Sequence, residues 1–167
     1  MMIGTVQSNF INRAAQRAAL LFFCLGFVSA GDPGTALAKM LLEKLWLTTS
    51  QGETQISIEV AESAEDMAMG LMFRTRLAED SGMLFPSSAP RESSMWMRNT
   101  YIPLDMIFIR ADGVIHRIEA MTEPLSETII ASNGDVLAVL ELAGGAAARL
   151  GLKPGDRVRH RIFQTAR

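Results

Sequence analysis

The sequence predicts a mainly β fold, a small jelly-roll-like sandwich or barrel of about eight or nine short strands with two helices. Two observations predict it. Short apolar runs that alternate with period two recur along the chain, as in half-buried strands. Turn-forming pairs such as Asp-Gly, Asn-Gly and Pro-Gly separate these runs, and short strands with turns between them favour a sandwich or a barrel.

The first thirty residues are typical of a secretory signal peptide. Arg13 and Arg17 precede the apolar run AALLFFCLGFV, and small residues follow it. The run has about half of the ~20 apolar residues that a membrane-spanning helix needs, so a cleaved signal is favoured over an uncleaved anchor. We expect cleavage before Gly31, or alternatively after residue 38, and an exported protein that is periplasmic or secreted.

The remainder of the chain is predicted to be a linker over 31–43 and a single β domain over 44–167. The whole chain has 16 Lys+Arg and 18 Asp+Glu, and Arg13 and Arg17 leave with the signal peptide, so the net charge becomes about −4. No basic stripe for nucleic acid remains, and a membrane contact is expected only if the N-terminal segment stays attached. The single cysteine, Cys24, is also removed, so no disulfide and no zinc–cysteine site is expected.

The first predicted element of the domain is a β-hairpin. Residues 44–50 and 54–60 both alternate between apolar and polar side chains, and a Gln-Gly pair lies between them. In the second run Ile56, Ile58 and Val60 share one face. This pattern predicts a hairpin with one buried face.

An amphipathic helix is predicted next, over residues 63–73. Ser63 stands three residues before Asp66, which is an N-cap signal. Apolar residues then follow at helical spacing as far as Leu71.

Three strands are predicted in the middle of the domain. Residues 82–85 are expected to form a short strand that ends at Pro86. Residues 104–109 and 114–118 flank an Asp-Gly pair, which is among the strongest short-range hairpin signals.

The last part of the domain is predicted to combine a strand, a short helix and a final strand. An Asn-Gly pair precedes an apolar strand over 136–143. Residues 145–150 are expected to form a short second helix that Gly151 ends. A Pro-Gly pair then fits the centre of a type II turn, and residues 157–163 form the last strand.

Five sequence blocks, in this order, resemble one known family. The blocks are GLMFR (70–74), GMLF (82–85), MWMRNTYIPLDMIFI (95–109), LELAGG (140–145) and GLKPGDRV (151–158). Together they resemble the domain-of-unknown-function family 192, found in secreted or membrane-anchored bacterial and archaeal proteins, over Leu45–Phe163. The resemblance implies a small β-sandwich of jelly-roll type. It carries no established activity and therefore assigns no catalytic residue.

Two carboxylates stand alone in strands that are otherwise apolar. They are Asp105, in PLDMIFI, and Glu141, in VLAVLELA. Burial of an unpaired carboxylate is costly, so each needs a partner or an opening to water, and Arg74, Arg76 and Arg98 are the candidate partners. A structural network of ion pairs and hydrogen bonds that fixes strand register is the favoured interpretation, and a ligand cleft built from the same groups is the alternative. A catalytic carboxylate pair acting on envelope carbohydrate is a further alternative.

A second candidate group lies just before the strand over 104–109. Asparagine beside a proline-containing turn most often closes the turn with its own side chain, and this is the favoured interpretation. An aromatic face beside a few polar anchors is also typical of pockets that bind a sugar or an anionic group. The hypothetical ligand site comprises Arg74, Trp96, Arg98, Asn99, Thr100, Asp105 and Glu141.

Methionines in the same region raise the possibility of copper. Met95 and Met97 share one face of an extended strand, and His116 could add an imidazole. Thioethers are soft ligands that select Cu(I), so a periplasmic Cu(I)-binding protein is one interpretation. Met67 and Met69 form a second M-x-M pair, but on a helix they point apart. Methionine is more often a flexible core filler, and core packing is favoured.

Familiar enzyme signatures are absent from the sequence. It lacks G-x-S-x-G, H-E-x-x-H, a P-loop and a dinucleotide fingerprint, and no cofactor is predicted. We expect a non-enzymatic binding or accessory module of the cell envelope, which takes a small polar ligand or a partner protein through the region of Arg98 and Asn99. The alternatives are a hydrolase that uses Asp105 and Glu141, and a Cu(I)-binding protein.

Overall fold

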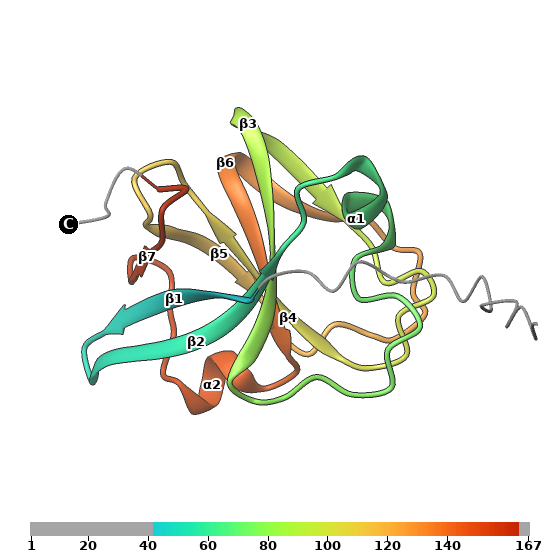
Figure 1. Cartoon of the computed structure of the whole chain (residues 1–167), viewed down its shortest axis with the longest axis horizontal. Helices are drawn as coiled ribbons and strands as arrows, with labels where there is room; N and C mark the ends of the chain where they lie inside the picture. The colour runs from blue at the N-terminus through green and yellow to red at the C-terminus, as the bar shows by residue number, and fades with distance from the viewer. Residues whose placement is uncertain (1–41, 164–167) are drawn as a thin grey trace, which may run out of the picture. The chain divides into compact units, whose positions relative to one another are not determined.

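The computed structural model describes residues 42–163, which form a mainly β fold, as the sequence predicts (Figure 1). Seven strands form one sheet in the order β5-β4-β6-β3-β2-β1-β7. The elements are β1 (Leu42–Thr49), β2 (Gly52–Val60), α1 (Ala64–Met69), β3 (Ser81–Met95), β4 (Leu104–Ile109), β5 (Ile115–Glu119), β6 (Ile130–Ala143), α2 (Ala146–Arg149) and β7 (Arg157–Arg159). The predicted signal peptide lies outside the described residues. No helix within them is long and apolar enough to cross a membrane.

The predicted N-terminal hairpin is formed by β1 and β2, which pair in antiparallel register with Leu45 opposite Ile56. Ile56, Ile58 and Val60 are buried, while the polar side chains between them are only half-buried. This is the alternation that period two predicts. β2 then runs parallel to β3, with Ile58 beside Gly82.

β3 is longer than the sequence predicts. It continues through Pro86 to Met95 instead of ending at the proline. Pairing with β6 becomes irregular between Pro86 and Arg91, and a residue without an N–H is tolerated where a ladder is already interrupted. The proline therefore marks an irregularity within one strand.

β6 is also longer than predicted, because the Asn133-Gly134 pair does not end a strand. Residues 132–134 stand opposite Ser93 alone, so the pair lies in a bulge. The hydroxyl of Ser132 accepts the N–H of Ser93 at 2.9 Å and replaces a missing ladder bond. The sheet has seven strands, somewhat fewer than the eight or nine expected.

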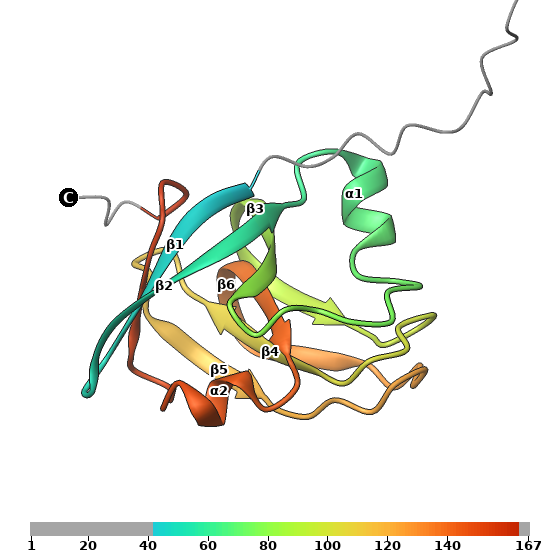
Figure 2. The same cartoon turned by 60° about the horizontal axis from the view of Figure 1, so that its bottom comes forward.

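The sheet curls into a half-barrel, and its two edge strands meet at a single bridge between Val114 and Arg157 (Figures 1 and 2). The predicted Pro-Gly turn brings β7 to this position, and Gly155 has the positive φ of 97° that a type II turn requires. β7 ends at Arg159, earlier than predicted. Within the curl lies the larger hydrophobic cluster, whose members include Leu45, Leu47, Ile58, Leu84, Ile107, Leu140, Ala147 and Phe163.

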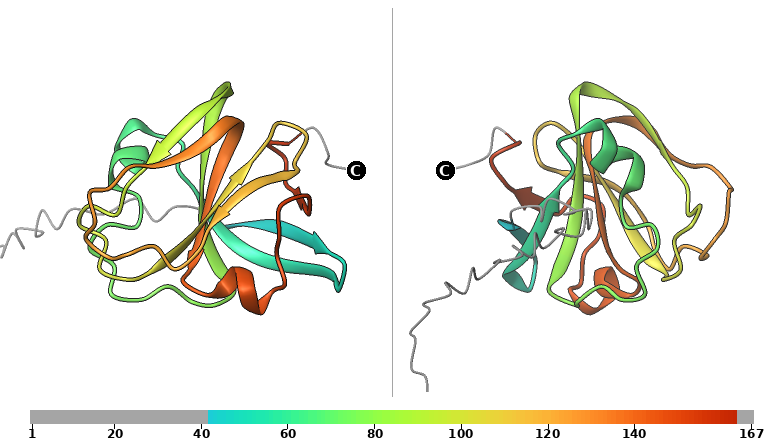
Figure 3. Two further views of the ribbon diagram at one scale, coloured as in Figure 1. Left: turned by 180° about the vertical axis from the view of Figure 1, so that it is seen from behind. Right: turned by 45° about the vertical axis from the view of Figure 1, so that its right-hand side comes forward.

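A second hydrophobic cluster lies on the opposite face of the sheet. Its members include Leu71, Met83, Phe85, Met97, Met106 and Phe108. Three connecting segments, residues 61–80, 96–103 and 120–129, gather at one end of the domain, where α1 also lies (Figures 1 and 3). We call these three segments the loop end.

Hydrogen bonds join the segments of the loop end to one another. The N–H of Phe73 donates to the carbonyl of Asn99 at 2.8 Å, and the N–H of Leu125 donates to the carbonyl of Thr100 at 3.0 Å. The segments therefore form one connected surface and are not independent loops.

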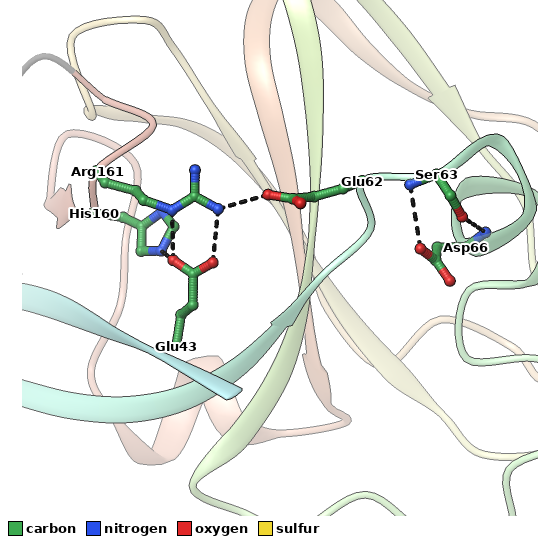
Figure 4. Close-up of polar contacts among 6 residues, drawn as sticks. All are labelled: Glu43, Glu62, Ser63, Asp66, His160 and Arg161. Carbon is green, nitrogen blue, oxygen red and sulfur yellow. Dashed lines mark hydrogen bonds and ion pairs between the residues drawn. The ribbon is translucent and has the colours of Figure 1, made fainter. Parts of the chain in front are cut away.

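α1 begins where the sequence predicts but is shorter. The Ser63 hydroxyl accepts the N–H of Asp66, and the Asp66 carboxylate accepts the N–H of Ser63, which completes a capping box (Figure 4). The helix ends at Met69 because the chain turns at Gly70, with a φ of 50°. A Cβ at Gly70 would lie 3.1 Å from the ring of Phe85. No residue of α1 is buried, so the part of the expected apolar stripe within the helix lies on the surface, whereas Leu71, just beyond it, is buried.

An ion-pair network ties the start of β1 to the residues after β7 (Figure 4). Arg161 donates two hydrogen bonds of 2.7 Å to Glu43 and one of 2.6 Å to Glu62. The hydrogen bonds from Arg161 lower the pKa of Glu43. His160 Nε2 lies 3.0 Å from the same Glu43 carboxylate, whereas its buried Nδ1 has no hydrogen-bond partner among the described residues.

His160 should make the domain less stable in mild acid. Burial lowers the pKa of His160 below 6.5, and Glu43 offsets this only in part. The neutral imidazole therefore favours the folded state above pH 6.5, and this contribution is lost as the pH falls through the lower pKa of the folded protein. We expect His160→Gln to lose less stability than the wild type between pH 7.5 and pH 5, measured by urea unfolding. His116→Gln, on β5, is the control, and identical slopes for His160→Gln and wild type would contradict the prediction.

Candidate functional site

Asp105 is fully buried at the start of β4 and binds three backbone N–H groups. Its Oδ1 accepts the N–H of Met121 at 2.8 Å and of Gly145 at 3.0 Å, and its Oδ2 accepts the N–H of Ala147 at 2.7 Å. Gly145 is the N-cap residue of α2. An N-cap side chain ordinarily accepts the free N–H groups at the start of a helix. Gly145 has no side chain, so the carboxylate of Asp105, on β4, accepts them instead.

The prediction that an arginine pairs with Asp105 is wrong. Arg74 forms a two-bond ion pair with Glu59, at 2.6 and 2.7 Å. Arg98 binds Glu127. Backbone donors satisfy the buried carboxylate instead, so its role is to hold α2 and the segment around Met121 against the sheet.

Asp105 and Glu141 project from opposite faces of the sheet. Asp105 stands opposite Leu142, and Glu141 stands opposite Met106, the residue after Asp105. Successive side chains of a strand point to opposite faces. The two groups therefore do not share a cleft, as a two-carboxylate glycoside hydrolase requires.

Glu141 is 4% exposed and lies on the face that the loop end covers. Burial raises the pKa of Glu141 to about 8, and the charge of Arg74 opposes this increase. No described residue hydrogen-bonds its carboxyl group. The guanidinium of Arg74 is hydrogen-bonded to Glu59 and acts on Glu141 through its charge alone.

A shallow pocket of about 50 Å³ opens above Glu141. Its lining consists of Met67, Ala68, Met69, Gly70, Leu71, Met72, Phe85, Met95, Trp96, Thr100 and Glu141. α1 and the turn at Gly70 contribute one wall, and the ends of β3 and β6 contribute the floor. We call this the Glu141 pocket. It places one titratable group among apolar and thioether side chains.

Trp96 lines the Glu141 pocket just after the end of β3, and Arg98 stacks on it. The guanidinium carbon of Arg98 lies 4.1 Å from the centre of the Trp96 ring, a cation–π contact. Arg98 also donates to Glu127 at 3.1 Å. Trp96 remains 42% exposed, so the part of its ring that Arg98 does not cover is accessible to a ligand.

Asn99 and Thr100 lie in the turn, but Asn99 does not close it with its own side chain as the favoured interpretation predicts, because its amide lies 3.9 Å from the sulfur of Met72. Asn99 has a φ of 57°, a left-handed conformation that asparagine tolerates. The buried Thr100 donates its hydroxyl to the carbonyl of Arg98 at 3.3 Å. Thr100 also lines the Glu141 pocket. Of the seven predicted ligand-site residues, the structure brings Trp96, Thr100 and Glu141 together and directs Asp105 elsewhere; binding by them stays a prediction.

The three residues considered for Cu(I) have different neighbours. The sulfur of Met97, which is fully buried, lies 3.1 Å from the hydroxyl of Thr122. His116 Nε2 lies 3.3 Å from the carbonyl oxygen of Asn133, and Met95 lines the Glu141 pocket. Within residues 42–163 no three His, Cys, Asp or Glu side chains are grouped to hold a metal ion.

A larger hollow, of about 180 Å³, lies between the β1–β2 turn and α2. Its charged lining residues are Glu53 and Arg149, and both are exposed. Glu53 is paired with Arg159. This hollow contains no buried titratable group, so the Glu141 pocket is the better candidate site.

Sequence reasoning missed most of the pocket wall. Met72 and Phe85 belong to blocks of the family pattern, but nothing in the sequence showed that they face Glu141. Glu59, the partner of Arg74, is one of the alternating polar residues of its strand, and the sequence alone gives no sign of that ion pair. One signal was available: Glu141 is the single charge of the apolar run over 136–143, and the surroundings of a buried charge are a candidate site.

The comparisons with known proteins agree with this fold. The model of the DUF192 family, described as Uncharacterized ACR, matches residues 46–160. A crystal structure of a candidate transcription regulator from Sinorhizobium meliloti is 43% identical, with a TM-score of 0.69, over 72% of this chain and 94% of that one. A protein of unknown function from Novosphingobium aromaticivorans is 41% identical, with a TM-score of 0.71, over 75% and 89%. No curated protein matches the chain.

Proposed function

Since the chain belongs to the DUF192 family of uncharacterised proteins, we propose that its domain is a non-enzymatic binding module that holds an ammonium group, carried on a short apolar stem, in the Glu141 pocket. The observation that carries the proposal is the carboxyl group of Glu141, which belongs to a residue only 4% exposed, has no side-chain hydrogen bond to a described residue, and opens onto the pocket. Such a group is completed by a ligand that supplies a cation and donors.

The surroundings favour a cation over an anion. The loop end has seven carboxylates, at positions 62, 65, 66, 79, 80, 123 and 127, against three arginines. Aromatic faces attract cations, and the rings of Phe85 and Trp96 both line the pocket, although Arg98 already stacks on Trp96. The pocket volume of about 50 Å³ suits a small head group. The methionine walls suit an apolar stem, because thioethers adapt to different shapes.

The lining also favours binding over catalysis. Glu141 is its single titratable side chain, whereas general acid–base catalysis on glycosides uses two carboxyl groups. The Thr100 hydroxyl, which also lies there, donates to a backbone carbonyl and has no base beside it in the lining.

Binding of an ammonium ion should release a proton from Glu141. With a pKa of about 8, the carboxyl group is largely protonated at pH 7 and must ionise to pair with a cation. We expect n-butylammonium to bind more tightly as the pH rises from 6 to 8, by up to about tenfold per pH unit. Titration calorimetry in buffers of different ionisation enthalpy measures the proton count, and Trp96 fluorescence measures the affinity.

Glu141→Gln should weaken n-butylammonium binding at least tenfold, since it removes the charge and keeps the shape. Glu123→Gln, an exposed carboxylate of the same loop end, is the matched control and should bind like the wild type. Tighter binding of neutral butanamide, with an affinity that falls above pH 8, would instead make Glu141 a hydrogen-bond donor and would refute the cation proposal.

We also propose that the domain works outside the cytoplasm. The basic and apolar residues before residue 31 support this. N-terminal sequencing of the protein purified from the cell envelope should begin at Gly31 or Lys39, and an intact Met1 on cytoplasmic protein would contradict it.

A further inference from the structure

The loop end carries nearly all of the large apolar side chains that the described surface exposes. They are Met67, Met69, Phe73, Trp96, Tyr101, Met121, Leu125 and Ile129, and the one outside the loop end is Leu42. Scattered single apolar residues are normal on a surface, but a connected group marks an interaction site. The hydrogen bonds between its segments make the loop end such a connected surface. Its apolar side chains therefore require a partner.

Three of these side chains are exposed by an unfavourable backbone conformation. Phe73, Met121 and Leu125 have φ values of 63°, 53° and 63°, and they are 53%, 59% and 56% exposed. Bulky residues other than glycine rarely adopt positive φ, and each such residue costs free energy. Hydrogen bonds within the domain hold these residues in place: the N–H groups of Phe73, Met121 and Leu125 donate to Asn99, Asp105 and Thr100. The fold therefore fixes this conformation, and its consequence is that three large apolar side chains are presented at the surface.

The charge of the loop end determines which kind of partner fits. Seven carboxylates face three arginines there. Ion pairs engage Arg74 and Arg98, and also Glu62, Glu79 and Glu127. Four carboxylates, at positions 65, 66, 80 and 123, then remain against Arg76. An apolar surface with an acidic border is complementary to a basic amphipathic segment and repels an acidic one. Anionic membranes are disfavoured for the same reason.

We propose that the loop end is the docking surface for a basic amphipathic segment of a partner protein, which inserts one lysine side chain into the Glu141 pocket. This inference rests on the proposed function, since the lysine supplies the ammonium group and its methylene stem. The pocket admits the end of one side chain, and the exposed apolar residues around it receive the neighbouring side chains of the segment. Exposed methionines, as at Met67 and Met69, are typical of surfaces that accept such segments.

The test uses the mature chain and three synthetic peptides, each about 16 residues long with capped ends. The first has an apolar face of Leu and a polar face of Lys. The second replaces each Lys with Glu, and the third keeps the composition of the first but scrambles the faces. Fluorescence anisotropy should show micromolar binding of the first peptide that weakens with salt, and at least tenfold weaker binding of the other two. Equal binding of the acidic or scrambled peptide would overturn the inference.

A double variant, Phe73→Asn with Leu125→Asn, separates docking from folding. Asparagine tolerates positive φ, so the substitutions remove apolar surface without adding strain. We expect unchanged or higher melting temperature and at least tenfold weaker peptide binding. Leu42→Asn, which removes the exposed leucine outside the loop end, should bind the peptide like the wild type. Unchanged peptide affinity in the double variant would overturn the docking surface.

Further outcomes distinguish this inference from the proposed function. Binding of n-butylammonium without binding of the basic peptide would overturn the docking surface and leave the proposed function intact. Binding of the peptide with equal affinity to Glu141→Gln would overturn the insertion of lysine. Binding of vesicles of uncharged phosphatidylcholine at the expense of the peptide would show a lipid surface instead of a protein partner and would overturn the inference.

Discussion

Asp105→Ala should destabilise the domain by about 3–5 kcal/mol, because it leaves three backbone donors without an acceptor. The N–H groups of Met121, Gly145 and Ala147 all bond to this carboxylate. Two of them belong to the first turn of α2, whose Ala146 and Ala147 pack into the core of the half-barrel. The variant therefore loses a helix cap and loosens one end of the core. A decrease in melting temperature of roughly 10 °C or more is expected.

Asp105→Asn tests how much each oxygen of the carboxylate contributes to stability. The amide oxygen can still accept the two N–H groups that Oδ1 accepts, but the amide NH₂ then faces the N–H of Ala147, donor against donor. We expect a loss of about half that of Asp105→Ala. Glu123→Ala, at an exposed carboxylate, should change the free energy of unfolding by no more than about 0.5 kcal/mol. A melt of Asp105→Ala within one or two degrees of wild type would show that these bonds are dispensable.

The elements that the sequence predicts well are those with local causes. The β1–β2 hairpin follows from alternation and a short turn, and the start of α1 follows from the pair Ser63 and Asp66. Pro86 shows the opposite case. Whether a proline ends a strand depends on what its neighbour strand does at that position, and the irregular pairing with β6 is not visible in the residues near Pro86.

The candidate site was predictable in part for a related reason. A lone carboxylate in an apolar strand indicates a buried polar anchor, and Asp105 and Glu141 are both buried. Their partners could not be predicted, since backbone N–H groups leave no mark in a sequence. Nor could their faces be predicted, because a register shift of one residue exchanges the two faces of a strand. Only the pairing of β4 with β6 shows that Asp105 is structural and that Glu141, on the other face, opens onto a pocket.

Glu141→Gln should make the domain more stable at high pH, in contrast to the usual loss from a buried substitution. The pKa of Glu141 is about 8 in the folded protein against 4.5 ordinarily. Between these values the unfolded chain loses the proton while the folded chain keeps it, so the wild type loses stability as the pH rises. Its contribution is fully present below pH 4.5, and the loss is complete above pH 8. Glutamine does not ionise in either state.

The difference between Glu141→Gln and wild type should therefore be small at pH 5 and large at pH 9. At 1.36 kcal/mol per pH unit, the two pKa values set an upper limit of about 5 kcal/mol, and we expect about 2–4 kcal/mol because a pocket that opens to water relieves part of the cost. Urea unfolding of both proteins at the two pH values measures it, since the other titrating groups cancel in the difference. Glu127→Gln, at an exposed carboxylate of the loop end, is the matched control.

The same variant tests why a carboxyl group is retained at this position. If Glu141 were only a structural residue, glutamine would be the better residue there at neutral and alkaline pH, and nothing would be lost by the exchange. We expect the stabilised Glu141→Gln domain to have lost its affinity for ammonium groups, so that stability rises while binding falls. If the difference in free energy of unfolding between Glu141→Gln and wild type were the same at pH 5 and pH 9, the prediction would be wrong. Glu141 would then be ionised in the folded protein, with its charge already stabilised by the domain.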